Sequence, residues 1–203
     1  MNQTLHDDIN EQLSYAYQDT PPLLPSGWTM VGLGQLISFA VGAAIFFLLV
    51  LTAPQNFVLI VDHVNLAIHE AGHVVLLPFG QMVHMWGGTL FQCLVPIAFG
   101  VYFWAHRQTA GTAVAGLWLG ENLPNIAHYM ADAQAMALPL IGGGTHDWNY
   151  ILTRLGLLNH CGPISTAVHV AGWIIMLAAV AWYVWRWRVS AAYLAQWRKQ
   201  RNA

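Results

Sequence analysis

The chain has 203 residues, of which 57% are hydrophobic and 8% charged, and its formal net charge at pH 7 is −2. Soluble domains carry about 25% charged residues, so this composition excludes an ordinary soluble domain and predicts an integral membrane protein. The weakly negative charge, with basic residues clustered only near the C-terminus, argues against nucleic acid as a partner and favours the lipid bilayer.

Residues 1–27 form a polar N-terminal arm that ends in the proline-rich stretch TPPLLPSG. The arm begins MNQTLHDDINEQL, which is acidic where a cleaved signal peptide would be basic, so we expect it to be retained. The rest of the chain predicts an all-α bundle of membrane helices. Residues 28–187 form the transmembrane domain, and residues 188–203 form a basic amphipathic tail.

Five segments of this domain are long and apolar enough to be transmembrane helices, since one crossing needs about 20 mainly apolar residues. They cover residues 29–52, 57–79, 82–104, 109–130 and 164–185. The first and last contain no Asp, Glu, Lys or Arg. The middle three carry histidines and amides, and two of them also carry carboxylates, which is unusual inside a bilayer.

Basic residues orient these helices, because loops rich in Lys and Arg stay on the cytoplasmic side. With five crossings, the loop at Arg107 and the C-terminal tail lie on one side, which predicts a cytoplasmic C-terminus and an external N-terminus. Residues 138–162 then form a long external loop whose one basic residue is Arg154. The tail suits either an interfacial helix on anionic lipid or a solvated end of the last helix.

Polar residues in two of the helices recur at helical spacing. At about 100° per residue, each set falls on one helix face. A charged group at the bilayer centre costs roughly 3 kcal/mol on insertion scales, so both polar faces should turn towards the bundle interior and towards each other. The two sets are Asp62, Asn65, His69 and His73, and Glu121, Asn125, His128 and Asp132.

The stretch LAIHEAGHVV, residues 66–75, contains the pattern His-Glu-x-x-His. On a helix, His69 and His73 are one turn apart and project the same way, so they can bind one Zn²⁺ ion at about 2.0–2.1 Å each. Such an ion lowers the pKa of its water towards about 7, and Glu70 stands beside it as the base. These residues predict hydrolytic chemistry, with amide hydrolysis as the first candidate.

A catalytic zinc ion needs a third protein ligand and one open position. Asp132, at the predicted end of its helix, is the first choice, and His146 in the glycine-rich loop is the second. His128, one turn before Asp132, is a further alternative. A ligating histidine often has a carboxylate behind it, and Asp147 or Asp132 could serve in that role.

The HEAGH element in a transmembrane helix, with Asn122, Pro124 and Asp132 in a later helix, resembles the site-2-protease-type intramembrane zinc metallopeptidases. Ala133 stands where that family has glycine. With GGTLFQ, YMADA and GGGTHDW, the pattern is similar to bacterial integral membrane proteins that carry HExxH. The resemblance implies a zinc peptidase of the inner membrane that acts on peptides or membrane proteins, with His69, His73 and Asp132 as ligands and Glu70 as the base.

Two other functions fit the same residues. The polar faces could belong to a non-catalytic metal-binding protein, an ion or proton transporter, or an assembly factor. A bis-histidine haem protein is a weaker alternative, because the chain lacks the CxxCH attachment motif.

Overall fold

The structure is a computed structural model that describes residues 24–140 and 144–202; most of the N-terminal arm lies outside these residues. Every regular element in the described part is helical, as the composition predicts. The α-helices are α2 (Leu33–Thr52), α3 (Leu59–Leu76), α4 (Gln81–Ala105), α5 (Thr109–Ala131), α6 (Asp147–Arg154) and α7 (Cys161–Arg201).

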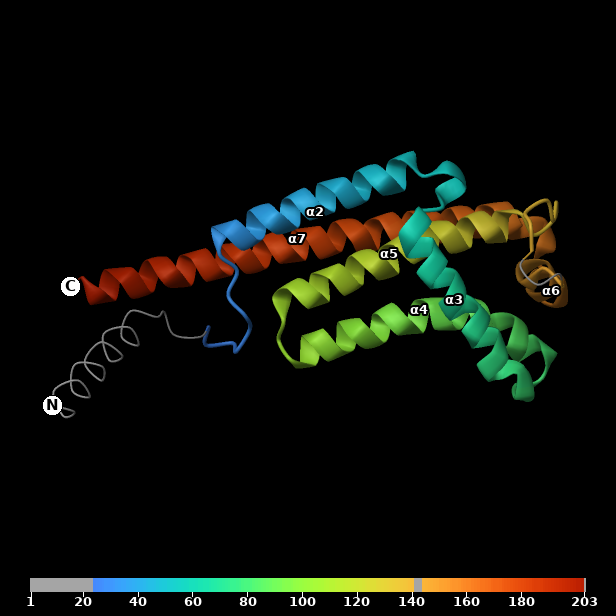
Figure 1. Ribbon diagram of the computed structural model, residues 1–203, viewed down its shortest axis with the longest axis horizontal. Coiled ribbons are helices and arrows are strands. Elements are labelled where there is room, and N and C mark those ends of the chain that lie inside the picture. Colours follow the sequence, from blue (N-terminus) through green and yellow to red (C-terminus); the bar gives the residue numbers. More distant parts are fainter. Residues whose placement is uncertain (1–23, 141–143, 203) are drawn as a thin grey trace, which may run out of the picture.

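The helices α2, α4, α5 and α7 run roughly parallel, and α3 is inclined steeply to them (Figure 1). The α5 and α7 helices approach closely because small residues face each other there: a Cβ atom on Gly172 would lie 2.5 Å from the Gly120 carbonyl oxygen. Small residues at such contacts are typical of helices that pack within membranes.

Among the described residues, three segments are long and apolar enough to cross a membrane: Leu33–Thr52, Gln81–Ala105 and Leu158–Arg201. The α3 and α5 helices, which the sequence also predicts as crossings, carry the two polar faces instead. These faces turn inwards, because Asp62, Asn65 and Glu121 are all buried. The polar side chains that make α3 and α5 less hydrophobic than the other long helices therefore make contacts within the bundle.

The start of α2 lies at the same end of the bundle as the α4–α5 connection. The Thr29 amide donates to the Arg107 carbonyl oxygen at 3.0 Å, and the Thr109 amide donates to Thr29 Oγ1 at 2.9 Å. The sequence-based topology placed residues 29 and 107 on opposite sides because it counted α3 as a full crossing. The inclined α3 instead begins and ends in the half of the bundle away from the α4–α5 connection (Figure 1), so α2 and α4 alone separate the two positions.

The last helix is continuous over 41 residues, from Cys161 to Arg201. At 1.5 Å per residue it is about 60 Å long, twice the hydrocarbon thickness of a bilayer. Its C-terminal part extends beyond the other helices (Figure 1). The basic tail therefore continues the last helix as far as Arg201.

Candidate metal centre

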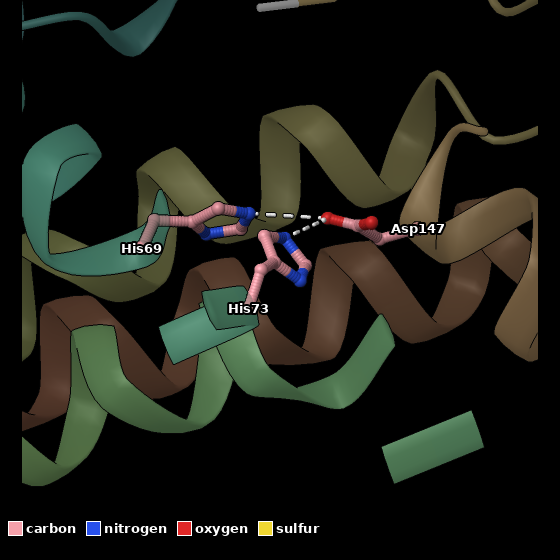
Figure 2. A group of neighbouring side chains, drawn as sticks. All are labelled: His69, His73 and Asp147. Atoms are coloured by element: carbon pink, nitrogen blue, oxygen red, sulfur yellow. Dashed lines mark hydrogen bonds and ion pairs between the residues drawn. The ribbon is translucent and has the colours of Figure 1, made fainter. Parts of the chain in front are cut away.

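The two histidines of the HEAGH element meet a carboxylate from α6. The α3 helix places His69 and His73 one turn apart, and both rings point towards Asp147 (Figure 2). Each Nε2 atom lies 3.1 Å from Asp147 Oδ2. The three ligand atoms all lie within 4.8 Å of one another, and His69 and Asp147 are buried. We call these residues the His69–His73–Asp147 group.

The other ring nitrogens fix the orientation of both imidazoles. His69 Nδ1 donates to the side-chain oxygen of Gln92 at 3.1 Å, and His73 Nδ1 donates to the His84 carbonyl oxygen at 2.7 Å. With the Nδ1 protons used in this way, each neutral ring directs an Nε2 lone pair at the carboxylate. Lone pairs that converge in this manner require a cation, or added protons, between them.

Two of the three spacings between the ligand atoms are close to those around a tetrahedral metal ion. Bonds of about 2.0–2.1 Å in a tetrahedron put neighbouring ligand atoms about 3.3 Å apart. The two distances of 3.1 Å from Asp147 Oδ2 to the histidine nitrogens lie close to that value. Hydrogen bonds from ligating imidazoles to carbonyl oxygens are also the usual support of metal-bound histidines. The residues present could therefore hold a metal ion.

Glycines bring α3 and α4 close enough to enclose the histidines. A Cβ atom on Gly72 would lie 2.2 Å from the Gly87 carbonyl oxygen, so the two backbones are in direct contact. A Cβ atom on Gly88 would lie 2.2 Å from His69 Nε2. The glycine in HEAGH and the pair in MWGGTL thus provide the space that the metal centre occupies.

Substitution of Gly88 by alanine should test this requirement. The clashing atom is the far end of the His69 side chain, which can rotate, so the helices can stay in place while the ligand moves. We expect zinc affinity to fall about 10- to 100-fold, as when a ligating histidine loses its orientation, with little change in unfolding temperature. Titration calorimetry with Zn²⁺ measures this. Gly100→Ala, on the same helix and with only an ordinary contact at 3.6 Å, is the matched control.

Asp147 is positioned by α6, which begins at this residue. Its backbone amide donates to the Tyr129 hydroxyl at 3.2 Å, and the Asn149 side chain donates to the Ala133 carbonyl oxygen at 2.8 Å. These contacts dock α6 against the end of α5. Burial disfavours the charged carboxylate, but His69 and His73 outweigh burial through the hydrogen bonds that they donate when Nε2 carries a proton, so the pKa of Asp147 lies below its usual value.

Asp132 and His146, the two residues that the sequence favours as third ligand, lie outside this group. Asp132 Oδ2 is 3.5 Å from His146 Nε2, and the Asp132 carboxylate accepts the amides of Ala137 and Leu138 at 3.0 and 2.9 Å. His146 Nδ1 accepts the amide of Asn149 and so caps α6. This pair therefore supports the loop that carries Asp147, the residue that the sequence suggested only as a carboxylate behind a ligand.

Burial acts to raise the pKa of the Asp132 carboxyl. The hydrogen bonds from the loop amides and the effect of the nearby His146 outweigh burial, so the pKa is lowered. Burial lowers the pKa of His146, despite the neighbouring carboxylates. Asp132 is therefore an anionic anchor for the loop, beside an imidazole that favours its neutral form.

A cavity of about 550 Å³ opens beside the His69–His73–Asp147 group. Glu70 and His128 line it, and His128 Nε2 is buried without a hydrogen-bond partner among the described residues. Much of the remaining wall is apolar, formed by Phe57, Leu66, Ile126, Leu138, Pro139 and Leu140. The cavity thus combines an apolar wall with a large set of polar side chains, several of them titratable, and such concave sites are typical of ligand binding.

Comparison with protein-family models, with curated proteins and with solved structures finds no match to this chain. The functional argument therefore depends on the arrangement of the residues themselves.

Proposed function

We propose that this protein is a zinc-dependent peptidase that cleaves peptide bonds within or at a membrane. The observation that carries the proposal is the convergence of two histidine nitrogens and one carboxylate oxygen beside Glu70, at the edge of a cavity that has an apolar wall. Three protein ligands leave one position for water or substrate, which is the arrangement of catalytic rather than structural zinc sites.

His69, His73 and Asp147 hold the ion, which when bound supplies a Lewis acid that polarises a carbonyl group and acidifies water. Glu70 follows His69 directly in the chain and lines the same cavity, so it can take a proton from the attacking water and return it to the leaving amine. The apolar cavity wall accommodates the side chains of a hydrophobic peptide segment.

Two further groups can donate hydrogen bonds to the oxygen of the scissile carbonyl. The Tyr129 hydroxyl accepts the Asp147 amide and keeps its own proton for donation. His128 lines the cavity, and its Nε2 atom is buried without a hydrogen-bond partner among the described residues. Hydrogen-bond donors that are already in place around the carbonyl oxygen stabilise the negative charge that develops there in the transition state, without having to reorganise.

The distribution of basic residues indicates how the protein sits in the membrane. The α4–α5 connection with Arg107 lies at the opposite end of the bundle from α6 and the metal centre (Figure 1). The positive-inside rule places the Arg107 end in the cytoplasm, and the metal centre then faces the external half of the bilayer. The proposed location is a bacterial inner membrane. The proposed substrates are peptides or membrane proteins.

The decisive experiment compares wild-type protein with Glu70→Gln, both purified in detergent and loaded with Zn²⁺. We expect Glu70→Gln to keep its zinc, measured by elemental analysis, and to cleave a library of hydrophobic fluorogenic peptides about 10²–10⁴-fold more slowly, because only the base is lost. Full activity in Glu70→Gln would contradict the role of Glu70. Wild-type protein that binds zinc but cleaves nothing would favour the non-catalytic metal-binding alternative.

A further inference from the structure

A second group of acidic side chains lies in the bundle interior, away from the metal centre. Asp62 on α3 and Glu121 on α5 are buried, with exposed fractions of 1% and 2%. Asp62 is nearly two helical turns before His69 on the same helix. The ion pairs of the described residues all join histidines to Asp132 or Asp147, so neither Asp62 nor Glu121 has a Lys or Arg partner there.

One amide group joins the two carboxyls. Asn65 Nδ2 donates to Asp62 Oδ1 at 3.1 Å and to Glu121 Oε2 at 3.2 Å. The orientation of the Asn65 amide is fixed from its other end, because the Trp118 indole donates to Asn65 Oδ1 at 2.7 Å. The nitrogen, and not the oxygen, therefore faces the carboxyls.

This arrangement favours a proton over a metal ion between the two acids. Ca²⁺ and Mg²⁺ need several oxygen ligands, yet N–H groups face the acids: the Asn65 amide contacts both, and the Val58 backbone amide also donates to Asp62. Two adjacent carboxylates in a buried site without a basic partner cannot both stay ionised, because burial and mutual repulsion each oppose the second charge.

The hydrogen bonds also indicate which acid holds the proton. Asp62 accepts two N–H groups, from Val58 and Asn65, whereas Glu121 accepts only the one from Asn65. Donors of this kind stabilise the charged form, so Asp62 is the carboxylate and Glu121 the acid. Among the described residues, the one other titratable group whose charge acts on this pair is His63, on α3; the α5 neighbour Trp118 is uncharged.

We propose that Asp62 and Glu121 form a proton-binding site that holds one proton at neutral pH and exchanges it with the adjacent cavity. Asp62 lines that cavity, as do Glu70 and the metal-site histidines, so the path to cavity water begins at Asp62. The pair can store a proton close to the proposed base. The proposal does not depend on peptide cleavage, and its test uses no substrate.

Infrared difference spectroscopy of the purified protein tests the site directly, because a protonated carboxyl has a carbonyl stretch that a carboxylate lacks. Wild-type protein should show this band at neutral pH, and the band should shift in D₂O as the proton exchanges. Glu121→Gln should remove the band, since Asp62 alone keeps its N–H donors and ionises. Glu70→Gln is the matched control and should retain it.

Asp62→Asn provides a second, independent readout. It removes the negative neighbour, so the Glu121 band should persist and should disappear at a lower pH than in wild type. Absence of the band from wild-type protein at neutral pH overturns the proposal, whatever the behaviour of the variants. Persistence of the band in Glu121→Gln overturns the assignment of the proton to Glu121. A wild-type band that does not shift in D₂O overturns the exchange of the proton with the cavity. Circular dichroism establishes that each variant is folded.

Discussion

Replacement of Asp147 by asparagine is expected to lower the zinc affinity of the purified protein by about 100-fold or more. The loss of a partner that merely orients a ligand already costs about 10- to 100-fold, and Asp147 supplies a ligand atom itself. Its Oδ2 atom lies 3.1 Å from both His69 Nε2 and His73 Nε2, so it completes the set. Asparagine keeps the shape of the side chain and removes its charge. Competition against a fluorescent zinc chelator measures the change.

Asp132→Asn is the matched control, because it makes the same chemical change on the neighbouring carboxylate. Asp132 contacts His146 and two loop amides, so its loss should loosen the loop and weaken zinc binding by about 10-fold, not abolish it. The opposite order of effects, with zinc lost in Asp132→Asn and retained in Asp147→Asn, would show that Asp132 is the third ligand, as the family resemblance implies.

The HEAGH element could be interpreted from sequence because all its chemistry lies within one helical turn. Helical spacing alone places His69 and His73 on the same face, and the structure has them there. The same periodicity predicts that Asp62 and Asn65 share this face, and both are buried. Local patterns of this kind depend on helix geometry and need no knowledge of the tertiary fold.

The third member of the group depends on the path of a long connection, which spacing does not determine. Asp132, His146 and Asp147 all occur at one end of the bundle, and each carries a suitable donor atom. The structure distinguishes them through α6: His146 caps the helix with its ring, and Asp147 in the first turn points to the histidines. A THD stretch before an amphipathic segment indicates where a helix begins, but it does not indicate which of these residues is a ligand.

The inclination of α3 to the other helices could also not be predicted from the sequence. Its apolar residues and length resemble those of a membrane crossing, and composition does not distinguish a helix that spans the bundle from one that is inclined to it. The close contact of Gly72 with Gly87 depends on tertiary packing, in which two glycines allow the backbones of α3 and α4 to touch. The predicted topology separated residues 29 and 107 by three crossings, whereas a hydrogen bond joins them at one end of the bundle. The α4–α5 connection and α6 lie at opposite ends of the bundle (Figure 1).

Gly72→Ala is expected to destabilise the protein by roughly 1–3 kcal/mol and to abolish tight zinc binding. The new Cβ atom would lie 2.2 Å from the Gly87 carbonyl oxygen and 2.7 Å from its carbonyl carbon. These are backbone atoms, which cannot rotate away, so α3 and α4 must separate. Because His69 and His73 both belong to α3, the separation also moves two ligands away from Asp147. Thermal unfolding in detergent, followed by circular dichroism, measures the loss of stability.

Gly42→Ala distinguishes this contact from a general effect of replacing a helical glycine. Gly42 lies within α2, and a Cβ atom there would meet nothing within 4 Å. Alanine loses less conformational entropy than glycine when a helix forms, so this variant should be more stable than wild type by about 0.5–1 kcal/mol and should bind zinc normally. Equal stability of the Gly72→Ala and Gly42→Ala variants would mean that α3 and α4 do not touch at Gly72, and the enclosure of the metal centre by these two helices would then be wrong.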